Sequence, residues 1–214
     1  MGFLRASIAR SSALSFAALA WAAATASAQT SASLDGGYQH LTNARRSAEA
    51  VLGSPGGPTL GASFRYPLGG SAFVGGTARF FRQEGERAFV AEPGSPVFHL
   101  GHPLTVQIVP VYATFGWRFR PDATLVPYAG AGAGVAFYRE TSTVAGVELD
   151  PVSRTRASGL AFAGAEYGRG RVRFGREGSY SLTPGTLDAG GVGDVYDEDD
   201  VGGFAVLGRV VFVF

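Results

Sequence analysis

Side chains alternate between apolar and polar at every second position along eight segments of this chain, which is the period of a β-strand. The last segment shows this most clearly. Counting back in twos from Phe214 gives an uncharged row with an aromatic residue at each end, while the other row carries Arg209. The pattern predicts an all-β fold with strands over residues 31–41, 58–68, 71–83, 104–120, 124–139, 156–168, 171–182 and 202–214.

The connections between these segments alternate between long and short. The long ones are 42–57, 84–103, 140–155 and 183–201, and the tight ones are 69–70, 121–123 and 169–170. An even number of strands with long loops at one end and short turns at the other is typical of an outer-membrane β-barrel, whereas a soluble β-sandwich has no reason to sort its loops. We therefore predict one domain over residues 29–214, an eight-stranded antiparallel up-and-down transmembrane β-barrel whose lumen is filled by side chains.

Aromatic residues on the apolar rows gather near both ends of the predicted strands. Those beside the short turns or the C-terminus are Tyr66, Trp117, Phe119, Tyr167, Phe212 and Phe214, and those beside the long loops are Tyr38, Phe80, Phe137, Tyr180 and Phe204. Membrane barrels carry two such girdles, so we expect the apolar rows to face lipid. Phe212 and Phe214 are expected to close the barrel and to be read by the barrel insertion machinery.

Residues 1–28 have the organisation of a cleaved signal peptide. Arg5 and Arg10 form a basic start, an apolar stretch follows, and residues 26–28 form an A-x-A cleavage site. The apolar stretch is too short for a transmembrane helix. The sequence therefore predicts export, a mature chain that begins at Gln29, and a location in the cell outer membrane.

Composition excludes several classes of protein. Without Arg5 and Arg10 the chain has 16 basic and 17 acidic residues, a balance that gives no sign of a nucleic-acid partner. Cysteine is absent, so there is no disulfide framework. Beyond residue 28 no run of 18 apolar residues occurs, which excludes a helical membrane protein.

A glycine-rich strand carries a resemblance to a known family. Residues 127–134 read Pro-Tyr-Ala-Gly-Ala-Gly-Ala-Gly after a tight turn, and such alternation thins one row of a narrow lumen. With residues 115–119 (Phe-Gly-Trp-Arg-Phe) and the terminal residues 210–214, this motif resembles the small eight-stranded outer-membrane barrel domains of the OmpA and OmpX type. The resemblance spans residues 29–214. It implies a monomer surrounded by outer-membrane lipid and lipopolysaccharide, but no single function, because such barrels include anchors, adhesins and lipid-modifying enzymes.

Charged residues fall on the rows that would face the lumen. Buried charges must be paired, and the planar fork of arginine can satisfy carboxylates on two sides. We predict a structural polar network of Asp35, Arg65, Arg79, Arg118, Glu166, Arg173, Glu177 and Arg209. Arg176 does not fit, because alternation places it on the lipid face; we expect a bulge near Gly175 or a position close to the membrane interface.

The long loops hold the remaining candidates for chemistry. Six acidic residues lie between positions 188 and 200, but without the EF-hand spacing a solvated loop is favoured over a Ca²⁺ site. His99 and His102 form an H-x-x-H pair that lacks further ligands. Ser179 and Ser181 would need a histidine beside them to act as nucleophiles, and no spacing provides it. We expect no catalytic residues, no metal and no cofactor.

These observations favour a non-enzymatic outer-membrane barrel that anchors four exposed loops, because loops on a rigid scaffold usually carry recognition. Three alternatives stay open. The first is a narrow gated pore through an arginine-rich lumen. The second is a lipid A-modifying barrel enzyme. The third is a secreted soluble barrel of the lipocalin type, whose apolar rows would face inward.

Overall fold

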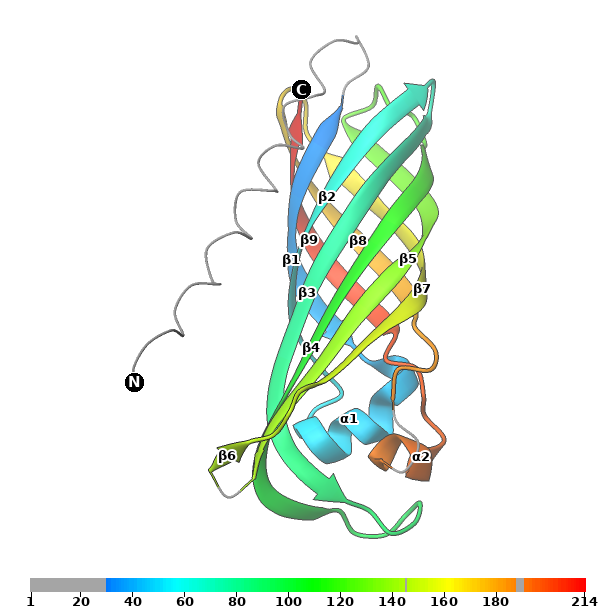
Figure 1. Cartoon of the computed structure of the whole chain (residues 1–214). Helices are drawn as coiled ribbons and strands as arrows, with labels where there is room; N and C mark the ends of the chain where they lie inside the picture. The colour runs from blue at the N-terminus through cyan, green and yellow to red at the C-terminus, as the bar shows by residue number, and fades with distance from the viewer. Residues whose placement is uncertain (1–29, 145, 188–190) are drawn as a thin grey trace, which may run out of the picture.

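The computed structural model describes residues 30–144, 146–187 and 191–214, and within them the chain forms one closed ring of antiparallel strands. The predicted signal peptide, Gln29 and Asp188 lie outside the described residues. The strands are β1 (Ser31–His40), β2 (Gly56–Gly69), β3 (Ala72–Phe89), β4 (Phe98–Arg118), β5 (Leu125–Val144), β6 (Val147–Glu148), β7 (Val152–Tyr167), β8 (Val172–Leu182) and β9 (Gly203–Val213). Figure 1 shows the ring as a tall, tilted wall with the helices gathered at one end.

Each long strand pairs with its neighbours along the chain, and β1 pairs with β9 from Ser31↔Val213 to His40↔Phe204. The β4–β5 pairing runs from Leu104↔Ser142 to Arg118↔Tyr128, and the β1–β9 pairing closes the ring. The two-residue β6 only extends the hairpin after β5. The predicted ring of eight antiparallel strands is therefore confirmed.

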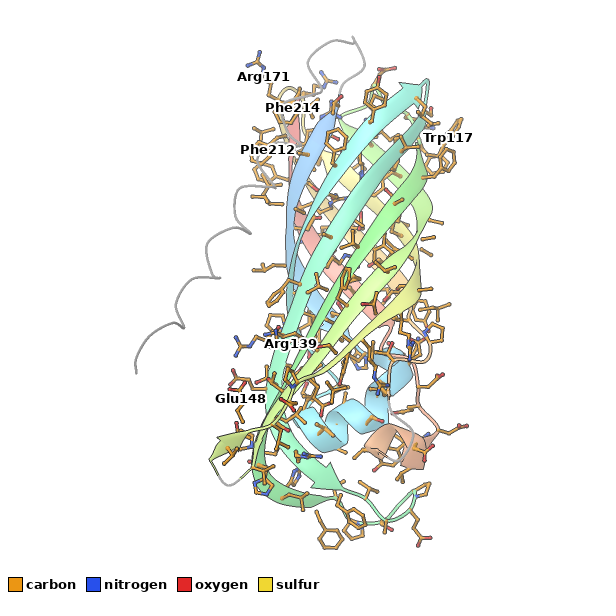
Figure 2. All side chains as sticks on the ribbon, in the orientation of Figure 1. Trp117, Arg139, Glu148, Arg171, Phe212 and Phe214 are labelled. Atoms are coloured by element: carbon orange, nitrogen blue, oxygen red, sulfur yellow. The ribbon has the colours of Figure 1, made fainter. Side chains whose placement is uncertain are left out.

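Three strands extend furthest beyond their predicted bounds. β3, β4 and β5 run past the rest of the ring, so that β3 and β4 still pair at Phe89↔Phe98 (Figure 1). The expected long loops 84–103 and 140–155 are wrong in this respect, because much of each is strand. We call the end of the ring with these extensions the long-connection end, and the opposite end, where Phe214 lies, the short-turn end (Figure 2).

Glycines on the inner faces of β5 and β7 make room for aromatic rings in the lumen. A Cβ atom on Gly130 would lie 2.5 Å from Cζ of Phe162, and one on Gly164 would lie 2.6 Å from the hydroxyl oxygen of Tyr128. The thin rows therefore serve to admit bulky side chains from the neighbouring strands, rather than to leave space open.

The first long connection is helical, contrary to the loop predicted there. A 3-10 turn, η1 (Thr42–Ala44), leads into α1 (Arg45–Leu52), which ends at Gly53 in the left-handed conformation. The buried side of α1 carries Ala48 and Leu52, which belong to one apolar cluster with Phe81 of β3. This burial holds the helix across the long-connection end of the ring (Figure 1). No helix among the described residues is both long and apolar enough to cross a bilayer.

The N-terminus of α1 is capped from the far end of the chain. The carboxylate of Glu198 accepts hydrogen bonds from the backbone N–H groups of Arg46 (3.1 Å) and Ser47 (2.8 Å) and from the Ser47 hydroxyl (2.7 Å). Glu198 follows the short helix α2 (Val192–Tyr196) in the β8–β9 connection. A carboxylate at this position satisfies donors that have no partner within the helix and interacts favourably with the helix dipole.

Replacing Glu198 by alanine is expected to loosen α1 without unfolding the ring. Loss of a capping side chain costs about 1–2 kcal/mol, so amide hydrogen exchange in residues 49–53 should become about 5- to 30-fold faster. The control is Glu49→Ala, which removes only an exposed pair with Arg45 and should change exchange by less than about threefold. Equal effects of the two variants would contradict the capping role.

Candidate functional site

The middle of the lumen is occupied by ion pairs that meet at Glu177 of β8. Its carboxylate accepts hydrogen bonds from Arg65 at 3.0 Å and Arg79 at 3.1 Å, and it also pairs with Arg209. Arg65 reaches a second carboxylate, Glu166, at 2.8 Å. All five side chains are more than nine-tenths buried. One glutamate thus binds guanidinium groups from three different strands.

Arg209 joins this centre to the first strand. Its Nε donates to Asp35 at 2.8 Å, and its Nη1 donates to the Tyr128 hydroxyl at 2.8 Å. Its Nη2 donates to the hydroxyls of Ser33, at 2.6 Å, and Ser63. The three arginines and three carboxylates of the network balance in charge, which a buried cluster requires.

Aromatic rings pack against the same guanidinium groups. The guanidinium carbon of Arg65 lies 4.1 Å from the ring centre of Tyr128 and 4.9 Å from that of Phe73. Phe73, Tyr128 and Phe162 belong to one buried cluster. A cavity of about 10 Å³, the space of about one water molecule, lies among Arg65, Phe162 and Glu177. Side chains therefore fill this part of the lumen.

The structure brings together six of the eight residues proposed for the polar network: Asp35, Arg65, Arg79, Glu166, Glu177 and Arg209. Arg118 lies nearer the short-turn end and donates to Ser31 at 3.2 Å, and Arg173 lies half-buried on the inner row of β8. Sequence reasoning missed Tyr128 and the serine hydroxyls, although their positions on the inner rows were a signal. Phe212 and Phe214 point away from the ring at the short-turn end (Figure 2).

Arg176 projects from the outer face of β8 and is exposed. Pairing is continuous through Gly175 on both sides of the strand, so the bulge alternative is wrong. Among the described residues, Arg176 is the one charged side chain on the outer rows between the two sets of aromatic residues.

The alternation of apolar and polar side chains changes phase along one line across β3, β4 and β5, where the outward-facing row turns from apolar to polar. Three apolar doublets lie in register there: Phe80-Phe81, Ile108-Val109 and Phe137-Tyr138. On the short-turn side of this line the outer row is apolar and the inner row polar. Beyond it the outer row carries Arg82, Gln107 and Arg139, and the inner row of β4 carries Leu104 and Val106, which join Phe81 and Tyr138 in one apolar cluster.

An apolar cavity of about 400 Å³ lies beyond this line, between the helices and the strand extensions. Its walls include Leu41, Ala48 and Leu52 from the first connection and Leu104, Val106 and Ile108 from β4. Tyr138, Glu140 and Arg87 contribute polar groups. Sequence reasoning did not anticipate this site, because it assigned only polar rows to the lumen; the phase change at Ile108-Val109 was the available signal.

The other candidates from the sequence have structural partners. Besides Glu198, Asp200 accepts from the Thr183 and Gly202 N–H groups, so the expectation of a solvated acidic loop is wrong for these two half-buried residues. Asp199 accepts from the Gly185 N–H group but is exposed. The described residues contain no group of three or more metal-ligating side chains. Within the described part of the chain no hydrogen bond joins Ser179 or Ser181 to a histidine; Ser179 accepts from Arg79 at 2.7 Å.

Comparison with solved structures identifies the fold. The crystal structure of Neisserial surface protein A matches with a TM-score of 0.51 at 14% identity, covering 87% of this chain and 96% of that chain. A major outer membrane protein from Thermus thermophilus matches with a TM-score of 0.52 at 11% identity, covering 88% of this chain and 100% of that chain. This chain has the outer-membrane β-barrel fold. No protein-family model and no curated protein sequence matches it, so the likeness is one of fold.

Within this barrel fold, Glu177→Gln is expected to be strongly destabilising. Removing its charge leaves three buried guanidinium groups without their shared partner, which costs about 3–5 kcal/mol in comparable buried pairs. Urea unfolding of the refolded protein in detergent measures the change. Glu84→Gln is the matched control, because Glu84 pairs with Arg82 on the surface and should contribute about 0.5 kcal/mol. A loss below about 1 kcal/mol for Glu177→Gln would contradict a central role for this carboxylate.

Proposed function

We propose that this protein is a non-enzymatic barrel of the outer membrane that anchors ordered surface segments at its long-connection end. The observation that carries this proposal is the outer surface of the ring. Leu34, Leu60, Val111 and Val206 are exposed in its middle. An exposed apolar surface on this scale is unfavourable in water and favourable in lipid.

Aromatic residues border this surface at both ends, as in membrane barrels. At the short-turn end Trp117, Phe212 and Phe214 point outward, and at the other end Arg139 projects beyond the phase-change line (Figure 2). From Phe204 to Phe214 the outer row covers ten residue steps; at about 3.4 Å per residue and a tilt of about 40° this is roughly 26 Å. Membrane barrels have an apolar band of about 25 Å.

Export and insertion complete the proposal. Residues 1–28 act as a cleaved signal peptide, and Phe212 and Phe214 are read by the insertion machinery at the periplasmic side. The barrel is a monomer that contacts outer-membrane lipid and, through its outer rim, lipopolysaccharide. The long connections, which include α1, α2 and the extensions of β3, β4 and β5, then lie on the cell exterior.

The filled lumen favours an anchor over the gated pore. Ions would have to separate the pairs at Glu177, which are buried and hydrogen-bonded on several sides. A lipid A-modifying enzyme is disfavoured because the serines of β8 bond to Arg79 and to backbone rather than to a histidine. A soluble lipocalin-type barrel is disfavoured because the ring interior is charged and its exterior apolar.

Cell fractionation tests the location. The full chain, expressed in a Gram-negative host, should sediment with outer membranes, resist extraction by alkaline carbonate, and migrate faster on a gel before heating than after it. Intact-mass spectrometry of the mature protein should give the mass of a chain that starts at Gln29, as glutamine or as its cyclised form. Recovery in the periplasmic wash would contradict the membrane proposal and favour the soluble alternative.

Replacing Arg176, the charged side chain on the outer rows between the two sets of aromatic residues, should stabilise the barrel. An arginine on the lipid face costs about 2–4 kcal/mol at mid-depth and less near an interface, and its stem can bend toward the headgroups. Arg176→Leu should therefore raise the free energy of unfolding in lipid vesicles by about 1–3 kcal/mol. Arg82→Leu, beyond the phase-change line, should change it by about 0.5 kcal/mol or less. Destabilisation by Arg176→Leu would argue against lipid at this face.

A further inference from the structure

The cavity at the long-connection end has the dimensions and walls of a ligand site. Its volume of about 400 Å³ falls within the range of about 300–1,000 Å³ for small-molecule sites. Leu104, Val106 and Ile108 line one side, and Leu41 and Ala48 line the side formed by the first connection. An apolar space of this size gains free energy when an apolar chain covers its walls.

Two charged side chains, Glu140 and Arg87, line the cavity. The Glu140 carboxylate accepts a hydrogen bond from the Tyr138 hydroxyl at 2.9 Å. Arg87 of β3 is exposed and makes no ion pair or hydrogen bond with other described residues. Of the two charged groups, the guanidinium is therefore the one that has no partner to give up when a ligand binds.

We propose that this cavity binds a single-chain amphiphile with an anionic head group, of the fatty-acid class. The alkyl chain lies between α1 and the inner faces of β4 and β5, and the carboxylate pairs with Arg87. At roughly 30 Å³ per heavy atom, the share of a water molecule in the liquid, the cavity holds about a dozen chain atoms. A saturated chain of about twelve carbons therefore fits. The cavity lies among the connections, so this proposal does not depend on the outer surface facing lipid.

Binding of sodium laurate and its homologues to the full-length mature protein in phosphatidylcholine nanodiscs tests the proposal. Isothermal titration, with empty nanodiscs subtracted, should show affinity rising about threefold to fourfold per methylene from eight carbons up to about twelve, and then levelling off. Dodecyltrimethylammonium, with the same chain and a cationic head, should bind at least tenfold more weakly. Equal binding of the two heads would overturn the anionic assignment, and absence of a chain-length dependence would overturn the cavity.

Two pairs of variants separate the chain site from the head-group site. Val106→Trp fills the cavity and should weaken laurate binding at least tenfold, whereas Val109→Trp, on the outer row of the same strand, should not. Arg87→Gln should weaken laurate binding about five- to tenfold and leave binding of uncharged dodecanol unchanged, whereas Arg82→Gln should change neither. Equal losses within either pair would contradict the site.

Photolabelling keeps the test decisive if Val106→Trp fails to fold. A laurate analogue with a diazirine at its chain end should label wild-type peptides from residues 41–52 and 104–108. Labelling confined to outer rows, such as residues 109–115, would show that the chain partitions into lipid only and would overturn the proposal.

Discussion

The shared carboxylate of Glu177 is the interaction on which the interior of this ring depends. Three arginines point into a narrow space, and each would be a costly buried charge if it stood alone. Glu177 binds all three, while Glu166 and Asp35 supply the remaining negative charge. Because these residues come from β1, β2, β3, β7, β8 and β9, the network joins opposite walls of the ring, which backbone pairing alone cannot do. Aromatic rings at Phe73, Tyr128 and Phe162 form a buried cluster that packs against it.

The molecule has two parts that differ in whether apolar side chains lie outside or inside. The two parts meet at the register line Phe81↔Ile108↔Tyr138. On one side the protein is apolar outside and charged inside, as expected of a wall that stands in lipid. On the other side it has the ordinary arrangement of a water-soluble domain, with an apolar cluster inside and arginines outside. The strands run through both parts without a break, so a single sheet supports a membrane-type segment and a small soluble-type cap made with α1.

Strand periodicity sufficed to predict the ring, because a period of two is imposed wherever the two faces of a strand meet different surroundings. It failed for the extensions at residues 84–89 and 98–103, where charged residues, glycine and proline interrupt the pattern. The inner rows could be identified from the sequence, but not the partners of their charged residues. That Arg65 meets Glu166, 101 residues away, depends on the stagger of strands around the ring.

The cavity escaped prediction because the inner row of β4 changes from polar to apolar at Ile108. The helix α1 and the residue before it have apolar residues at positions 44, 48 and 52, a helical spacing that a search for strands overlooks.

The cap that Glu198 forms on α1 has a consequence for the order of assembly. Ser47 and its capping carboxylate are separated by 151 residues, and β1 closes the ring only against β9. The helix therefore cannot acquire its cap until the β8–β9 connection has reached the long-connection end. Contacts of such long sequence separation form slowly. Docking of α1 should then be among the last folding events.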